Sequence, residues 1–330
     1  MNTTFRIVTG GLQTTIQDLG RVGHQSAGVP GGGAMDRAAL RIANLLVGND
    51  DGAAAIEAAL IGPAITFDGA TLVAVAGGDL EPSVNGAPVP SWHPIMIPRG
   101  GTLRFGRARF GCRAYIAIAG GIDVPMVFGS RSTYLRAEFG GFEGRALRSG
   151  DLLQAGAPSA LSARLAASLP DHGAVARWSI GGTLRPRYSD DIIVRLIPGA
   201  HAGALNDVSR ERLFDATFHV SSNSDRMGYR LEGVELALDE PIELLSEGVV
   251  FGTVQLPPSG VPIVLMADGQ TTGGYPRIGE VATVDLPLMA QLKPGDRVRF
   301  RPISVQDAQK EYFNHERELT QARYAIALRR

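Results

Sequence analysis

The chain has 330 residues, which is enough for two hydrophobic cores of ordinary domain size. Its 32 Lys and Arg residues balance 33 Asp and Glu residues, so charge gives no reason to expect nucleic acid or an anionic membrane as a partner. The apolar fraction of 44% excludes a disordered chain, and 42 glycines with 20 prolines favour many tight turns between short strands.

Short runs rich in Val, Ile and Phe, each bounded by Gly, Pro, Asp or Asn, predict strands. In chain order these runs are Leu72–Ala76, Ile95–Ile97, Thr102–Phe105, Tyr115–Ala119, Ile192–Ile197, Phe218–Ser221, Ile242–Leu245, Ile263–Met266 and Arg297–Phe300. Their spacing is typical of a barrel or a sandwich, so we predict a mainly β fold.

Helices are expected at only a few places. Asp36 is a natural N-cap for a helix over Arg37–Val47, and a second helix is predicted over Ser159–Ser168. A third begins at Ser304, with Asp307 three residues on as a box-like cap, and runs towards the C-terminus. We expect this C-terminal helix to pack on the second domain or on a partner.

Two turns of the same kind suggest an internal duplication of a β-domain. Gly150-Asp151 and Gly295-Asp296 each lead into a strand, although Gly-Asp turns also recur by chance in a β-rich chain. The stretch 157–187 carries the expected boundary. We therefore predict a first domain over residues 1–180 and a second over 181–330 that includes the C-terminal helix.

The single cysteine, Cys112, cannot form an internal disulfide, so an oxidising compartment is not indicated. It lies in an apolar run, which favours a buried, inert thiol over a reactive one. The N-terminus lacks a basic segment followed by a long apolar stretch, and no run approaches the roughly 18 apolar residues of a membrane span. A cytoplasmic protein is expected.

Several motifs with known chemistry are absent from the sequence. There is no P-loop for ATP, no dinucleotide-binding glycine motif, no cysteine pair or histidine spacing for zinc, and no nucleophile elbow. A Met-Lys-Met-type biotin attachment site is also missing. If carboxylated biotin takes part, another chain or domain must carry it, and no metal site is predicted.

Polar side chains lie between glycines in a first candidate segment, residues 14–23. Within it Gln17, Asp18 and Arg21 are only a few residues apart. Arg21 can bind a carboxylate with two hydrogen bonds, and Asp18 can orient that arginine or accept a proton. The alternative is a structural Asp–Arg pair that holds a turn.

A second candidate segment, residues 224–233, places two arginines around an aromatic residue. In a strand Arg226 and Arg230 share one face, where they can hold an anionic substrate, and Tyr229 lies opposite. The alternative is a salt-bridged β-surface that includes Glu232.

The third candidate segment is the most specific, because a buried apolar strand ends in a row of polar and glycine positions. Its amide, hydroxyl and phenol groups suit a small ureido or lactam group, which offers both donors and acceptors: Gln255, Gln270, Thr271, Thr272 and Tyr275. A Gly-rich structural turn is the alternative. None of the three segments pairs a nucleophile with an adjacent base, as expected if another polypeptide supplies half of the site.

Several motifs, in order, resemble the family of the 5-oxoprolinase C subunit and allophanate hydrolase subunit 2, within the biotin-dependent carboxyltransferase superfamily. They are Thr14-Thr15-Ile16-Gln17-Asp18-Leu19-Gly20-Arg21-Val22-Gly23, Gly129-Ser130-Arg131-Ser132-Thr133, Ser224-Asp225-Arg226-Met227-Gly228-Tyr229-Arg230-Leu231 and Gln270-Thr271-Thr272-Gly273-Gly274-Tyr275-Pro276. The resemblance covers about residues 5 to 308. Gly269 departs from it, since the family commonly has a side chain there.

This resemblance implies two cyclophilin-like β-barrel domains and an active site shared with a partner like allophanate hydrolase subunit 1, the 5-oxoprolinase B subunit. It further implies a lactam-utilisation-type A subunit. The complex would open 5-oxoproline to L-glutamate while hydrolysing ATP, which the complex binds and which this subunit need not contact. Arg21 with Arg226 or Arg230 would hold a carboxylate or phosphorylated intermediate, and Gln270, Thr271 and Thr272 would contact the lactam.

Two alternatives remain open from the same resemblance. The chain could be the carboxyltransferase half of a urea carboxylase or allophanate hydrolase system, with carboxybiotin supplied by a separate chain. It could also be a non-catalytic regulator of a sensor kinase that acts through a kinase-inhibitor partner.

Overall fold

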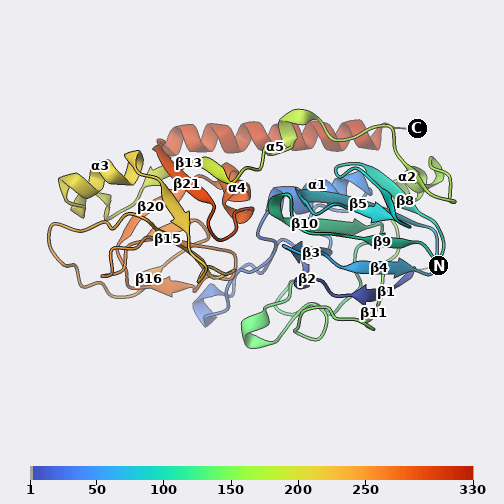
Figure 1. Cartoon of the computed structure of the whole chain (residues 1–330), viewed down its shortest axis with the longest axis horizontal. Coiled ribbons are helices and arrows are strands. Elements are labelled where there is room, and N and C mark those ends of the chain that lie inside the picture. The colour runs from blue at the N-terminus through green and yellow to red at the C-terminus, as the bar shows by residue number, and fades with distance from the viewer. Residues whose placement is uncertain (1–2, 330) are drawn as a thin grey trace. The chain divides into compact units, whose positions relative to one another are not determined.

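The computed structural model describes residues 3–329, which form two compact units (Figure 1). Unit 1 contains the chain up to Gly20, the stretch Asp36–Pro186 and the chain from Arg317 on; unit 2 contains Arg21–Met35 and Arg187–Glu316. The predicted domains are continuous, with the limit between residues 180 and 181. Each compact unit instead includes a segment from the other side of this limit: the chain from Arg317 on belongs to unit 1, and Arg21–Met35 belongs to unit 2. The domain limits themselves stay a prediction.

Unit 1 consists of two six-stranded sheets, drawn in blue to green in Figure 1. The first has, in spatial order, β11 (Leu152–Gln154), β1 (Thr4–Thr9), β4 (Ala64–Phe67), β9 (Thr102–Arg104), β6 (Ser83–Val84) and β7 (Ala87–Pro88). The second has β12 (Ala174–Val175), β8 (Pro94–Ile97), β5 (Thr71–Asp79), β10 (Phe110–Ile118), β3 (Ala55–Ala59) and β2 (Gln13–Gln17). All pairings are antiparallel, and both sheets contribute to one hydrophobic core.

Helix α1 (Arg37–Leu46) packs on β5 and β10, so these strands are covered on both faces. This explains why β5 is a continuous apolar run rather than an alternating one. The predicted cap is confirmed, since the Asp36 carboxylate accepts a hydrogen bond from the Ala39 amide at 2.9 Å. Helix α2 (Ala160–Ala167) begins after Ser159 and confirms the second predicted helix.

A bulge separates two parts of the ladder between β5 and β10, and Gly77 makes it possible. The register shifts between Phe110 and Ala114, opposite Gly77. Gly77 has φ +92°, and a Cβ built there would lie 2.5 Å from the Arg113 carbonyl oxygen. Only glycine fits at this position, because any side chain would strain the backbone and collide with the neighbouring strand.

Unit 2 is a closed seven-stranded barrel. Around the barrel the strands are β13 (Asp191–Pro198), β20 (Arg277–Val281), β17 (Thr253–Gln255), β18 (Ile263–Leu265), β15 (Gly228–Glu232), β14 (Phe218–Val220) and β21 (Arg297–Pro302). Parallel pairing of β13 with β21 closes it, and a separate antiparallel pair, β16 (Glu247–Gly248) with β19 (Thr272–Gly273), lies outside the barrel sheet. Two short helices belong to this unit, α3 (Asp207–Asp215) and α4 (Leu286–Ala290).

Buried and more exposed side chains alternate along the barrel strands, so one face of each strand contributes to the core and the other forms the outer surface. In β13, Ile192, Val194 and Leu196 are buried in the core, and in β21 Val298 and Phe300 join them. The mainly β, cyclophilin-like fold is thereby confirmed. One predicted strand is wrong: Ile242–Leu245 forms no strand, because this proline- and glutamate-flanked run leaves the barrel as a loop.

The C-terminal helix α5 (Val305–Ala327) is the long red helix of Figure 1. Its predicted cap is confirmed, since Ser304 Oγ accepts from the Asp307 amide at 3.1 Å and donates to the Asp307 carboxylate at 2.8 Å. Short 3-10 turns complete the structure at Gln25–Ala27, Leu135–Ala137, Gly182–Leu184, Ala202–Ala204 and Thr283–Asp285. No helix within residues 3–329 is long and apolar enough to cross a membrane, and Cys112 is buried as predicted.

Candidate functional site

The Asp18 carboxylate follows β2 and is surrounded by hydrogen-bond donors from residues 130–132. Ser130 Oγ donates at 2.6 Å, Ser132 Oγ at 2.5 Å, and the Arg131 amide at 2.5 Å. The Gly20 amide adds a fourth bond at 2.8 Å. This carboxylate therefore ties the Gly129–Thr133 motif to the end of β2.

Gln17 lies next to this cluster and is fully buried. Its Nε2 donates to Thr15 Oγ1 at 3.0 Å and to the Thr133 carbonyl at 3.2 Å. Its Oε1 has no hydrogen-bond partner within residues 3–329. Ser130 and Ser132 belong to a motif that the sequence analysis quotes, but nothing in the sequence identified them as partners of Asp18. Only the tertiary structure brings them to that carboxylate.

In unit 2, residues from all three candidate segments meet at Gly32; we name Arg21, Gly32, Arg226 and Asp268 the Gly32 cluster. Arg226 donates to Asp268 from Nε at 2.8 Å and from Nη2 at 3.0 Å, and Nη2 also donates to the Gly33 carbonyl at 2.6 Å. A Cβ built at Gly32 would lie 3.1 Å from Arg21 Nη1 and 3.6 Å from Asp268 Oδ1. The Gly32 amide donates to the Ala267 carbonyl at 3.0 Å.

The Gly32 cluster is a buried arrangement of charge, with Arg21, Arg226 and Asp268 all at most 7% exposed. Because Arg226 forms a two-pronged pair with Asp268, it holds the segment after β18 in place. The role of Arg226 as a direct substrate contact stays a prediction, and the geometry favours a supporting role.

The second segment does not place Arg226 and Arg230 on one face of a strand, as alternation along a strand predicts. β15 begins only at Gly228, so Arg226 precedes the strand, and Arg226 is buried whereas Arg230 is exposed. The two arginines therefore do not form one anion-binding face. Tyr229 points into the barrel core, where its hydroxyl donates to the Leu292 carbonyl at 3.3 Å.

The third segment supplies part of a group of neighbouring residues at β17, which we name the Gln255 site: Thr253, Gln255, Gln270, Gly273 and Glu280. Val254 points into the barrel core, so its neighbours Thr253 and Gln255 lie on the outer face. Gln255 is 1% exposed, and its Oε1 accepts from Gln270 Nε2 at 3.3 Å. Its Nε2 has no hydrogen-bond partner within the described residues.

A glycine allows the β19 loop to cover this amide closely. A Cβ built at Gly273 would lie 2.3 Å from Gln255 Nε2, so no larger residue fits without displacing Gln255. The loop is anchored by the pairing of β16 with β19, and Arg277 Nη2 donates to the Glu247 carboxylate at 2.5 Å.

Glu280 is a member of the Gln255 site that sequence reasoning missed. It lies opposite Thr253 in the β17–β20 ladder, and Thr253 Oγ1 donates to its carboxylate at 3.0 Å. Burial raises the pKa of Glu280 above its ordinary value, against the opposing effects of the Thr253 hydrogen bond and the Arg277 charge. A carboxyl group that keeps its proton more readily is a candidate acid.

Residues that flank Gln255 and Gly273 line a cavity of about 570 Å³. Its wall includes Leu256, Pro257, Gly274, Tyr275 and the run Pro241–Leu244, which overlaps the strand predicted over Ile242–Leu245. Tyr275 is 43% exposed, while Thr271 is half-buried and Thr272 is exposed, so these side chains are accessible. This volume is in the range of small-molecule sites.

Residues 3–329 contain no group of three or more His, Cys, Asp or Glu side chains placed to hold a metal ion. The Gln255 site itself offers an amide donor, the Thr253 hydroxyl and a carboxyl group with a raised pKa.

Residues 27–302 match the family model described as carboxyltransferase domain, subdomain A and B. The chain is 39% identical to the C subunit of 5-oxoprolinase from Haemophilus influenzae, covering 95% of this chain and 96% of that protein. It is 36% identical to the C subunit of 5-oxoprolinase from Escherichia coli, covering 98% of each. The crystal structure of the K. lactis urea amidolyase superposes with a TM-score of 0.88 at 31% identity, over 97% of this chain and 20% of that one.

Proposed function

Since this chain belongs to the carboxyltransferase domain A and B family, we propose that it is a subunit of an ATP-dependent 5-oxoprolinase complex. The observation that carries the proposal is sequence similarity. The chain is 39% and 36% identical to two proteins named as 5-oxoprolinase C subunits, over 96% and 98% of those proteins, and 31% identical to the urea amidolyase structure.

The Gln255 site supports this proposal chemically. A lactam presents a carbonyl oxygen and an N–H, and the buried Gln255 Nε2 is a donor suited to that oxygen. In the net reaction water adds to the carbonyl carbon, the C–N bond breaks, and the nitrogen gains a proton. Glu280, whose pKa is raised by burial, is the group of this site that would supply a proton to the leaving nitrogen.

The predicted site residues divide accordingly. Gln255, Gln270, Thr271, Thr272 and Tyr275 stay the proposed substrate contacts. Tyr275 lines the cavity, Gln270 donates to Gln255, and Thr271 and Thr272 belong to the segment between Gln270 and Tyr275. The Gly32 cluster would position the segment that carries them. Asp18 with Gln17 would hold the Gly129–Thr133 motif of unit 1.

The sequence has no P-loop, so ATP would not be bound through that motif. We propose that the complex binds ATP, which this subunit need not contact. A subunit-1-like partner would complete the site, and a lactam-utilisation-type partner would join the assembly.

The test is co-expression of this chain with those two partners, followed by measurement of glutamate released from 5-oxoproline with and without ATP. ATP-dependent release that disappears when this chain is omitted is expected. Release that continues without this chain, or none from a stable purified complex, would contradict the proposal. Gln255→Leu should lower kcat/KM about tenfold or more within the intact complex, because one polar contact is lost.

A second function is favoured by the TM-score of 0.88 to urea amidolyase, namely the carboxyltransferase half of a biotin-dependent urea carboxylase. Carboxybiotin would come from a separate chain, since this sequence has no attachment site. Turnover of urea that avidin abolishes would support this second function, and turnover unaffected by avidin would contradict it.

A further inference from the structure

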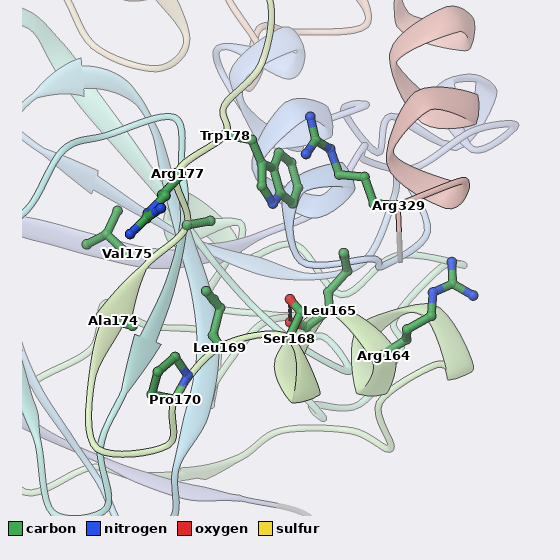
Figure 2. Close-up of a pocket in the computed structure, with 11 residues that line it drawn as sticks. Arg164, Leu165, Ser168, Leu169, Pro170, Ala174, Val175, Arg177, Trp178 and Arg329 are labelled. Atoms are coloured by element: carbon green, nitrogen blue, oxygen red, sulfur yellow. Dashed lines mark hydrogen bonds between the residues drawn. The ribbon is translucent and has the colours of Figure 1, made fainter.

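We propose that unit 1 contains a separate site for an organic anion with an apolar body. The site is a cavity of about 540 Å³ at the end of α2 (Figure 2). Its lining comes from α2, from the following loop and β12, and from the chain just after α5: Arg164, Leu165, Ser168, Leu169, Pro170, Ala174, Val175, Ala176, Arg177, Trp178 and Arg329. None of these residues belongs to the Gln255 site, so the inference goes beyond the proposed function.

Charge identifies the kind of ligand. Arg164, Arg177 and Arg329 all line the cavity, and no Asp or Glu side chain does. Within residues 3–329 none of these arginines forms an ion pair: Arg164 donates to the Ala327 carbonyl at 2.5 Å, and Arg329 stacks on an aromatic ring. Three guanidinium groups that line one cavity, with no counter-charge among residues 3–329 in its lining, favour an anion, and their planar donor forks suit a carboxylate or a phosphate.

The remaining lining is apolar, which indicates that the anion is organic. Leu165 is buried, and Leu169, Pro170 and Val175 form the wall beside it. Figure 2 shows Leu165 and Leu169 among the residues that surround the cavity together with Trp178. An inorganic ion would leave this wall without a partner, whereas an aromatic or short aliphatic body would cover it.

Trp178 and Arg329 give the site a prepared polar end. The Arg329 guanidinium lies over the indole ring at 4.4 Å from its centroid, so stacking orients the arginine before any ligand binds. The indole N–H is a donor only, as are the arginines. The volume is within the range of sites for small molecules, so we assign the site to a carboxylate or phosphate monoester with one ring or a short chain.

The experiment is calorimetric titration of the full chain with phenyl phosphate, with benzyl alcohol as the neutral analogue and inorganic phosphate as the bare anion. Phenyl phosphate should bind at one site, the alcohol should not bind, and inorganic phosphate should bind at least about tenfold more weakly. In the double variant Arg177→Ala/Arg329→Ala the Kd for phenyl phosphate should rise about tenfold or more. Arg107→Ala, an exposed arginine of unit 1 outside the cavity, is the matched control and should leave Kd unchanged.

A second reporter keeps the result independent of folding. The chain has two tryptophans, and Trp92 is buried elsewhere in unit 1, so phenyl phosphate should change the fluorescence of the wild type but not of Trp178→Phe. The proposal is overturned if phenyl phosphate does not bind or if folded Arg177→Ala/Arg329→Ala binds it as the wild type does. Equal affinity for inorganic phosphate would also overturn it.

Discussion

Replacing Asp268 with asparagine is expected to destabilise the barrel of unit 2 by about 3–5 kcal/mol, because the change removes the carboxylate from a buried ion pair. Arg226 and Asp268 are 6% and 5% exposed, and the two hydrogen bonds between them measure 2.8 and 3.0 Å. Asparagine keeps the shape of the side chain but provides no negative charge and only one acceptor oxygen. The guanidinium would then remain buried without the carboxylate it faces.

An exposed pair of the same unit provides the comparison. Asp207 and Arg210 are 3.1 Å apart, but their side chains are 93% and 49% exposed, so water and salt screen the attraction. Asp207→Asn should therefore cost less than about 1 kcal/mol. The double replacement Arg226→Met/Asp268→Leu should recover part of the loss seen in Asp268→Asn, because it removes both charges.

Unfolding in urea, followed by far-UV circular dichroism, measures these differences. Tryptophan fluorescence would miss them, since Trp92 and Trp178 both belong to unit 1 and the two units can unfold in separate steps. Hydrogen exchange in β15 and β18 would assign the loss to the barrel. If Asp268→Asn and Asp207→Asn lost the same free energy of unfolding, the reasoning from burial would be refuted.

Three further replacements test the Gln255 site and the N-cap of α1. Gly273→Ala should lower kcat/KM for glutamate release by the complex about tenfold or more, because the added Cβ would lie 2.3 Å from Gln255 Nε2 and displace that amide. Glu280→Gln should raise stability relative to the wild type at neutral pH and lose this advantage at a pH below the ordinary glutamate pKa. The raised pKa means that the folded state prefers the protonated carboxyl, so wild-type stability falls as pH rises from the ordinary value through the raised one. Asp36→Ala should cost about 1–2 kcal/mol of unfolding free energy, and Asp36→Asn should cost less because it keeps the cap on the Ala39 amide.

Each of these replacements has a result that would count against its reasoning. Wild-type turnover by Gly273→Ala would show that Gln255 has room to move without consequence. A pH-independent difference between Glu280→Gln and the wild type would remove the case for a raised pKa. Equal melting of Asp36→Ala and Asp36→Asn would mean that the cap on α1 contributes nothing measurable.

Local features were predictable because their causes lie within a few residues. The caps at Asp36 and Ser304 were predictable because the partner amides are three residues away in each case. Strand positions in β5, β13 and β21 follow from runs or alternation of apolar residues. The loop at 242–245 was mistaken for a strand because Ile242 and Leu244 line a cavity, and Leu245 is exposed, so none of its apolar residues belongs to the barrel core.

The sequence by itself determined the mainly β architecture, the positions of the principal helices and, through its motifs, the family. Only the tertiary structure decided which side chains meet, because Asp18 and Ser130 are 112 residues apart and Arg226 and Gly33 are 193 apart. It also separated Arg226 from Arg230 and brought out Glu280, whose pKa depends on burial and on a hydroxyl from a neighbouring strand. Spacing along a chain records local periodicity, whereas burial and pairing depend on how distant strands close into sheets.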